Sequence, residues 1–231
     1  MIQEQTVADI VTNDIRTATV FNKFGIDFCC GGKKKLEIAC NEKGIYLKNL
    51  VAELELVMSK GDENLDFQTM ALDELIEYIY EKHHKYIYEN GPITAQFVNK
   101  VAHVHGSRHP ETIEISQTFN MLMEDLHQHM MKEEKILFPY IKQMVQESQS
   151  NGSFVNGPIS VMMAEHDTAG DLLKKLNKLT SNYTPPVDAC NTYRASFANL
   201  KELENDIHFH IHLENNILFP KAIELESKLV S

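Results

Sequence analysis

Two segments of the chain are near copies of one another: residues 129–139 read HMMKEEKILFP and residues 210–220 read HIHLENNILFP. They align at an offset of 81 residues, which places His129 over His210 and Glu133 over Glu214. A single His-x-x-x-Glu pair carries little information, because roughly one is expected by chance in a chain of this composition. Two copies in the same Ile-Leu-Phe-Pro setting indicate that one structural unit has been duplicated.

The duplication extends upstream of both segments. His84 precedes His129 by 45 residues and His166 precedes His210 by 44 residues, so each half pairs a helix bearing one His with a helix bearing His-x-x-x-Glu. We therefore predict an all-α chain with a four-helix bundle over residues 70–231. The helices are expected at 70–90, at 93–108 together with 111–147 as the second leg, at 158–181 and at 188–227, with Pro92 and Pro110 among the breaks.

Helical spacing directs the duplicated polar residues into the bundle. Apolar residues and the duplicated polar residues follow one another at steps of three or four, which places them on one helix face. The two series are Leu122, Leu126, His129, Glu133, Ile136 and Tyr140, and Leu203, Ile207, His210, Glu214 and Ile217. Buried carboxylates and imidazoles are costly without a common partner. A dinuclear metal site satisfies them, with two carboxylates bridging and the imidazoles terminal, and these ligands suit iron, manganese or zinc, iron being our first choice.

The histidine of the first helix is ambiguous. The apolar stripe Leu72, Leu75, Ile76 and Ile79 centres on His83, whereas the repeat offset of 82 residues to His166 favours His84. Only one of the two is expected to bind metal.

Composition limits the function classes. Lys and Arg total 22 against 33 Asp and Glu, a net charge of −11, which argues against nucleic acid and anionic membranes as partners. We see no apolar run near the ~20 residues of a membrane span and no secretory signal. Four cysteines do not make a disulfide scaffold, so we expect a reducing, cytoplasmic location.

Residues 1–62 are predicted to form a separate, small helical domain, joined to the bundle by the polar stretch 59–66. Cys29 and Cys30 lie in a glycine-containing loop that leads into Lys33, Lys34 and Lys35. This positive field should lower the thiol pKa values and favour redox chemistry or iron handoff. The alternative is a structural loop in which one cysteine is simply buried.

Other polar residues are weaker candidates. His105 is interpreted as a core residue or as a neighbour of the metal ligands, and Asp125 and Glu165 either line a path for iron or protons or are solvated helix charges. Surface or rim positions are predicted for His83, His103, His109, His127, His208 and His212.

The motifs resemble those of the iron–sulfur cluster repair di-iron proteins, the repair-of-iron-centres family. The resemblance covers nearly the whole chain and rests on 27–33 (DFCCGGK), 129–139, 157–161 (GPISV), 165–170 (EHDTAG) and 213–220 (LENNILFP). It implies a hemerythrin-like bundle behind the N-terminal Cys-Cys-Gly-Gly domain, and two non-haem iron ions bridged by carboxylates. The implied metal ligands are His84, His129, Glu133, His166, His210 and Glu214, which resolves the choice between His83 and His84.

The resemblance also implies a function, namely repair of iron–sulfur clusters damaged by nitric oxide or oxidants, by donating iron to damaged or apo iron–sulfur proteins. The chain would act as a monomer or homodimer, and as an iron donor rather than a turnover enzyme. Three alternatives stay open: a hemerythrin-like binder of oxygen or nitric oxide, a di-iron redox enzyme acting on nitrogen oxides, and a metal-free helical interaction module.

Overall fold

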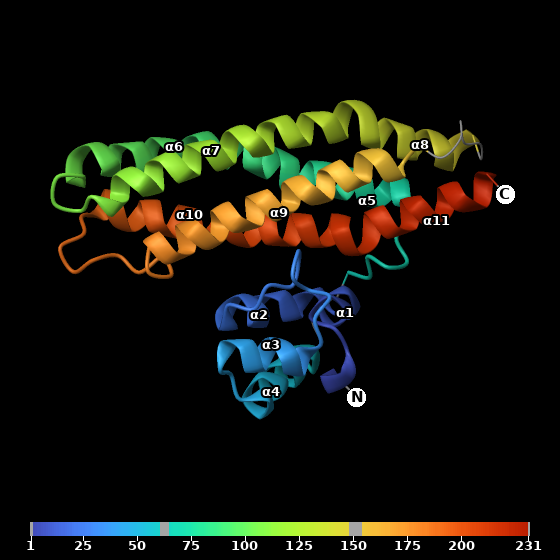
Figure 1. The fold of residues 1–231 in the computed structure, drawn as a ribbon, viewed down its shortest axis with the longest axis horizontal. Coiled ribbons are helices and arrows are strands. Elements are labelled where there is room, and N and C mark those ends of the chain that lie inside the picture. The colour runs from blue at the N-terminus through green and yellow to red at the C-terminus, as the bar shows by residue number, and fades with distance from the viewer. Residues whose placement is uncertain (1, 61–64, 148–153, 231) are drawn as a thin grey trace.

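The computed structural model describes residues 2–60, 65–147 and 154–230 (Figure 1). Over these ranges the regular structure is helical, and the one β-type contact is an isolated bridge between Thr6 and Lys35. The prediction of an all-α chain is confirmed. A small group of helices, blue in Figure 1, lies against one side of a long bundle. None of the described helices is long and apolar enough to span a membrane.

The bundle has four legs. The first joins α5 (Leu72–Ile79), η3 (Tyr80–His84) and α6 (Lys85–His105), and the second joins α7 (Glu111–Lys132), η4 (Glu133–Leu137) and α8 (Phe138–Glu147). The third is α9 (Asn156–Leu179), and the fourth joins α10 (Asn191–Leu213), η5 (Glu214–Leu218) and α11 (Phe219–Val230).

The predicted break at Pro92 is wrong, because α6 passes through this residue without ending. Ile87 and Val98, on either side of it, are buried in the same apolar cluster. A proline inside a helix costs roughly 3 kcal/mol, and burial of a continuous apolar stripe on both sides offsets that cost. Residues 93–105 therefore extend the first leg, whereas we had assigned 93–108 to the second.

Three legs contain a five-residue π-helical turn, η3, η4 or η5. Each turn includes one of the duplicated polar residues: His84, Glu133 or Glu214. A π turn takes up one residue more than an α turn, so the buried face moves by one position beyond it. The prediction that Ile136 faces inward is accordingly wrong: its side chain is 52% exposed, and Leu137 and Ile141 are buried in its place.

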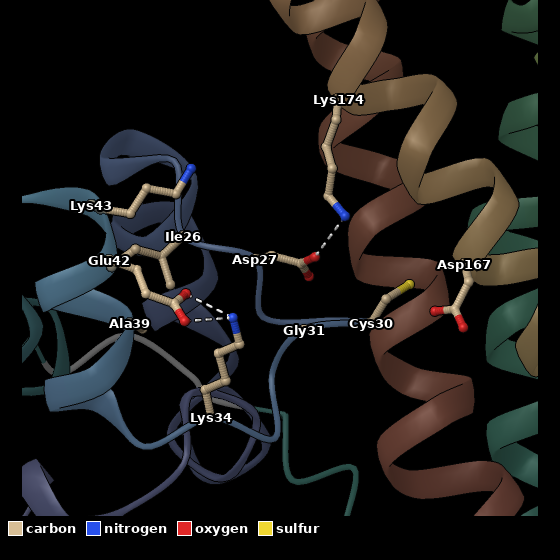
Figure 2. A pocket seen from close by; sticks show the side chains of 10 residues that line it. All are labelled: Ile26, Asp27, Cys30, Gly31, Lys34, Ala39, Glu42, Lys43, Asp167 and Lys174. Atoms are coloured by element: carbon tan, nitrogen blue, oxygen red, sulfur yellow. Dashed lines mark hydrogen bonds and ion pairs between the residues drawn. The ribbon is translucent and has the colours of Figure 1, made fainter.

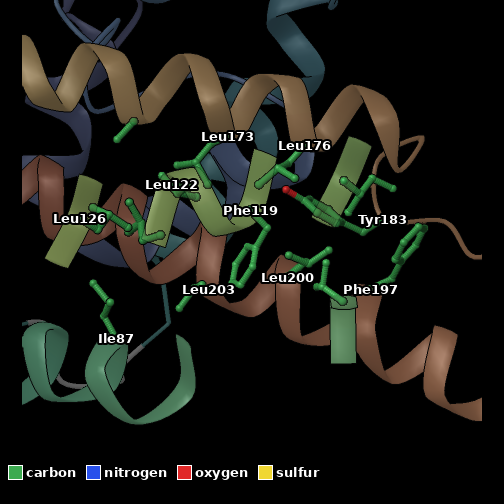
Figure 3. Packing of buried hydrophobic residues seen from close by; sticks show 14 of the residues in the cluster. Ile87, Phe119, Leu122, Leu126, Leu173, Leu176, Tyr183, Phe197, Leu200 and Leu203 are labelled. Atoms are coloured by element: carbon green, nitrogen blue, oxygen red, sulfur yellow. The ribbon is translucent and has the colours of Figure 1, made fainter. Parts of the chain in front are cut away.

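Apolar packing brackets the polar layer on both sides. One cluster includes Phe119, Leu122, Leu173 and Leu200 (Figure 3), and it fills the end of the bundle near the α6–α7 connection. The second cluster fills the opposite end, around α5, α8 and α11. The duplicated polar residues lie between the two clusters, where they are buried away from bulk solvent.

The N-terminal domain has its own core. Its elements are η1 (Ile2–Glu4), α1 (Val7–Asn13), η2 (Ile15–Thr17), α2 (Ala18–Phe24), α3 (Leu36–Lys43) and α4 (Leu47–Met58). Thr6 caps α1 by accepting a hydrogen bond from the Asp9 amide, and Val7, Phe21, Leu36 and Leu50 are fully buried. The predicted boundary at residue 62 falls in 61–64, outside the described residues.

The second glycine of the Cys-Cys-Gly-Gly loop is required sterically. A Cβ at Gly32 would lie 2.3 Å from the Phe28 carbonyl oxygen, whereas a Cβ at Gly31 would meet only the movable Asp27 side chain at 3.1 Å. We expect Gly32→Ala to destabilise the N-terminal domain by about 1–3 kcal/mol, as overpacking typically does. Gly31→Ala is the matched control and should cost much less. Urea unfolding of the two variants decides this, and equal losses would contradict the steric argument.

Candidate metal centre

Six polar side chains meet in the centre of the bundle, and none is more than 2% exposed. They are the residues selected from the repeat and the family resemblance: His84, His129, Glu133, His166, His210 and Glu214. All four legs contribute, because His84 ends η3, His129 and Glu133 lie at the α7–η4 junction, His166 lies in α9, and His210 and Glu214 lie at the α10–η5 junction.

The six residues form two groups that share both glutamates. His84 and His210 make one pair, with their Nε2 atoms 3.2 Å apart, and His129 and His166 make the other at 3.0 Å. Glu133 presents one oxygen to each pair, 3.4 Å from His84 and 3.3 Å from His129. Glu214 does the same, with each oxygen 3.1 Å from the Nε2 of His166 or His210. Each carboxylate therefore spans from one histidine pair to the other.

Hydrogen bonds outside the cluster orient three of the four imidazoles. Their Nδ1 atoms donate to oxygens that can only accept: His84 to Glu134 at 2.8 Å, His129 to Glu165 at 2.9 Å, and His166 to Asn215 at 2.9 Å, with the amide oxygen of Asn215 as acceptor. A neutral imidazole with its proton on Nδ1 has a lone pair on Nε2. These partners therefore direct lone pairs into the cluster, as they do around metal ions.

The two carboxylates have the environment of metal ligands. Within the described residues, no oxygen of Glu133 or Glu214 has a hydrogen bond of normal geometry. Burial raises the pKa of Glu214, but the neighbouring His210 and His166 outweigh it and hold that pKa well below the ordinary value. Two buried anions without hydrogen-bond donors need a cation between them. The donor set of nitrogen and oxygen without thiolate fits iron, manganese or zinc.

Comparison with known proteins agrees with this geometry. Residues 75–222 match the family model described as the hemerythrin HHE cation binding domain, and residues 3–58 match a domain of unknown function, DUF542. The iron-sulfur cluster repair protein YtfE of Enterobacter sp. (strain 638) is 39% identical over 96% of this chain and 97% of its own length. Those of Musicola paradisiaca (strain Ech703) and Escherichia coli O8 (strain IAI1) are 37% and 38% identical over similar shares.

The chain belongs to the YtfE family. Its bundle is thus a cation-binding domain of the hemerythrin type, and the family resemblance inferred from the sequence is confirmed.

In this YtfE-family chain the π turn Tyr80–His84 explains why periodicity favoured His83. The extra residue of the turn brings His84 into the cluster, while His83 stacks on His210 with ring centroids 5.8 Å apart. His83 Nδ1 lies 2.9 Å from Asp206, and its side chain is only 4% exposed. The prediction that His83 is a surface residue is therefore wrong.

Four further residues around the site were missed, although the repeat contains them. Glu134 and Asn215 follow the two glutamates at equivalent positions, and each accepts the Nδ1 proton of a histidine from another leg. Phe138 and Phe219, of the two Ile-Leu-Phe-Pro segments, stack on His84 and His166 at 5.5 and 5.9 Å. Reading the position after each glutamate as a partner of a histidine on another leg would have found Glu134 and Asn215.

The remaining histidines lie outside the six-residue cluster. His105 contacts Cys190, with its Nε2 3.3 Å from the sulfur, and packs on Tyr193, so it touches none of the six. His103 and His127 are exposed as predicted, and His109 and His208 are half-buried at the rim.

His212 is fully buried, against our prediction of a surface position. Its Nδ1 donates to the Phe28 carbonyl at 3.2 Å, its Nε2 lies 3.3 Å from the Thr12 hydroxyl, and burial lowers its pKa to about 4. The N-terminal domain covers this face of α10, which helical periodicity within the bundle could not reveal.

Asp125 and Glu165 line a cavity of about 190 Å³ that reaches His129 and His166. Glu165 also pairs with Lys132, and it accepts the Nδ1 proton of His129. Glu165 is therefore bonded to a cluster residue, and it is not simply a solvated helix charge.

The cysteine loop of the N-terminal domain lies against the bundle beside the cluster. Cys30 Sγ lies 3.5 Å from the carbonyl oxygen of His166 and 3.9 Å from Cys29 Sγ. Cys29 is buried and hydrogen-bonds Asp27, and the adjacent Cys30 thiol and burial raise its pKa well above the ordinary value. The predicted lowering of the pKa is therefore wrong for Cys29, because the Cys30 thiol, burial and Asp27 all raise it.

The buried carboxylates give a stability prediction. Removing one partner of a buried charge pair costs about 3–5 kcal/mol, because the group left behind is uncompensated. We expect Glu133→Leu/Glu214→Leu, which leaves the four imidazoles in place, to lower the melting temperature of the chelator-treated protein and to abolish the further rise that metal produces. Glu124→Leu, at an exposed position of α7 outside the six-residue cluster, is the control. Calorimetry with and without metal tests this, and an unchanged response to metal in the double variant would contradict the assignment.

Proposed function

We propose that this chain holds two iron ions in the six-residue cluster and supplies iron to damaged iron–sulfur proteins. One observation carries the proposal: two groups of four buried side chains that could hold a metal ion share both glutamates, which supports two adjacent cation positions. Carboxylates that serve two positions at once are the usual bridges of dinuclear sites.

The choice of iron rests on the ligands and on the relatives. Imidazole and carboxylate ligands suit iron, and the similar proteins are named iron-sulfur cluster repair proteins. Glu133 and Glu214 would bridge the two ions, with His84 and His210 on one and His129 and His166 on the other. Bound there, iron would be available both for redox chemistry and for transfer.

The surroundings offer a route for iron as cargo. The cavity beside His129 and His166 is lined by Asp125 and Glu165, so a cation leaving that histidine pair would pass carboxylate oxygens. Cys30 lies at the backbone of the same histidine, His166, and a thiol is a soft ligand that binds iron well. We therefore assign the exit to the His129–His166 side and an accepting role to Cys30, with Cys29 beside it.

The recipients would be damaged or apo iron–sulfur proteins, encountered in the cytoplasm. All four cysteines are free, which fits the reducing compartment proposed here.

Iron content tests the shared glutamates. The parent chain should carry about two irons, and Glu133→Ala or Glu214→Ala should remove nearly all of the iron because each glutamate serves both positions. His84→Ala should retain about half, since it affects one position, and the exposed His127→Ala is the control. Metal analysis with Mössbauer spectroscopy on anaerobically purified protein measures this. Full iron content in both glutamate variants would exclude the assignment.

Iron transfer tests the function. Loaded protein is mixed with an apo iron–sulfur protein under anaerobic conditions, and cluster formation is followed spectroscopically. We expect iron to move, and to move more slowly from a Cys29→Ser/Cys30→Ser variant with unchanged iron content. Cys190→Ser, at the far end of the bundle, is the control. Iron that stays bound, together with reversible oxygenation or nitric oxide binding, would favour the hemerythrin-like gas binder over repair.

A further inference from the structure

Two adjoining pockets form a groove between the N-terminal domain and the bundle. The first, of about 330 Å³, contains Cys30, which comes from the tip of the loop, and is drawn in Figure 2. The second, of about 480 Å³, shares Ile26, Asp27, Lys43 and Lys174 with it. These volumes fit a small molecule rather than a macromolecular chain.

The larger pocket is basic, although the whole chain has a net charge of −11. In the smaller pocket, Asp27, Glu42 and Asp167 balance three lysines. The larger pocket has only Asp27 and Glu204 as acidic residues, against five lysines from both domains: Lys23, Lys43, Lys174, Lys178 and Lys201. Lys174 and Lys178 lie four residues apart on α9, and Lys43 approaches from the end of α3. Like charges that face each other across two domains repel one another, so an anion between them would stabilise this arrangement.

Three of these lysines form no ion pair among the described residues, although Lys201 interacts electrostatically with Glu204. In the described part of the chain no ion pair or hydrogen bond involves Lys43, Lys178 or Lys201, whereas Lys23 pairs with Glu53, and Lys174 with Asp27 and Asp171. Asn22, Asn177 and Asn205 add amide groups that can donate hydrogen bonds along the same wall.

A soft sulfur group lies at the other end of the groove. Figure 2 shows the Cys30 side chain on the bundle side of the smaller pocket, near Asp167, and Lys174 reaching down from α9 to Asp27. Cys29 is buried behind it and is bonded to Asp27, so Cys30 is the thiol of the pair that a ligand can reach.

We propose that the groove binds a small thiol bearing carboxylates, with its carboxylates among Lys43, Lys178 and Lys201 and its sulfur beside Cys30. Sulfur next to sulfur allows exchange: the Cys30 thiolate attacks a disulfide of such a molecule, the Cys30–S bond forms as the old S–S bond breaks, and the released thiolate takes up a proton. The binding site stands on its own, whereas a role for this thiol as an iron carrier rests on the proposed function.

Disulfides that differ in charge test the site. Full-length protein in a Cys29→Ser background, which prevents displacement of the adduct, is reacted with oxidised glutathione (anionic), bis(2-hydroxyethyl) disulfide (neutral) or cystamine (cationic). The rate of adduct formation at Cys30 is measured by mass spectrometry with peptide mapping. We expect oxidised glutathione to react faster than the neutral disulfide at low ionic strength, with the preference falling as salt is added.

The lysines are tested by charge removal. The measured quantity is the rate of adduct formation with a charged disulfide, divided by the rate with the neutral disulfide. Lys43→Gln/Lys178→Gln/Lys201→Gln should lower this ratio about tenfold for oxidised glutathione, and should raise it for cystamine. Lys33→Gln/Lys35→Gln, which removes two exposed lysines near Cys30 in sequence but outside both pockets, is the matched control and should change neither ratio.

Equal ratios in the parent and the triple variant would overturn the proposal, as would the absence of any adduct at Cys30. The experiment is run on metal-free and on iron-loaded protein. A charge preference in both, with no iron transfer to an acceptor, would leave the groove in place and reject the iron-carrier role. Iron transfer without a charge preference would reject the groove, and with it the carrier role, and would leave the proposed iron donation in place.

Discussion

Two glutamates buried at the centre of an apolar bundle are the constraint on which the rest of the structure depends. Glu133 and Glu214 lie between two hydrophobic clusters and have no hydrogen bond of normal geometry within the described residues. An isolated carboxylate in such a place is unstable unless cations or imidazoles compensate it. Glu133 and Glu214 are surrounded by the four histidines. The outer hydrogen-bond acceptors and the two stacked phenylalanines in turn hold these imidazoles in place.

The duplicated segments made the six cluster residues predictable, and the π turns limited what periodicity could add. Spacing of 3.6 residues assigns Ile136 and His83 to the inner face, but η3 and η4 each take up one residue more, which turns Leu137 and His84 inward. The offset between the two glutamate-bearing legs is insensitive to this effect, because η4 and η5 are matching turns. The offset from His84 to His166 is one residue longer, and only the first of these two legs has a π turn. Comparison between copies was therefore a better guide than periodicity within one copy.

Contacts between the two domains could not be read from either domain alone. His212 lies on a face of α10 that a bundle in isolation would expose, and it is buried only because Phe28 and Thr12 cover it. The cysteine loop has the same dependence: the sequence shows lysines beside it, but the fold places Asp27 against Cys29 and pairs Lys34 with Glu42. The local charge pattern therefore gave the wrong direction for the pKa shift of Cys29, because tertiary structure sets the surroundings of this thiol.

The two histidine pairs match as ligands but differ in access. Glu165 and His83 occupy equivalent positions, each one residue before a cluster histidine. Glu165 accepts the Nδ1 proton of His129 and borders the open cavity, whereas His83 stacks on His210, is bonded to Asp206 and packs on Phe209.

His210 is accordingly the one cluster histidine whose Nδ1 has no partner in the described part of the chain. One histidine pair thus lies beside an acid-lined cavity, and the other is enclosed by aromatic rings. This difference in access is the reason why the exit for iron is proposed on the His129–His166 side.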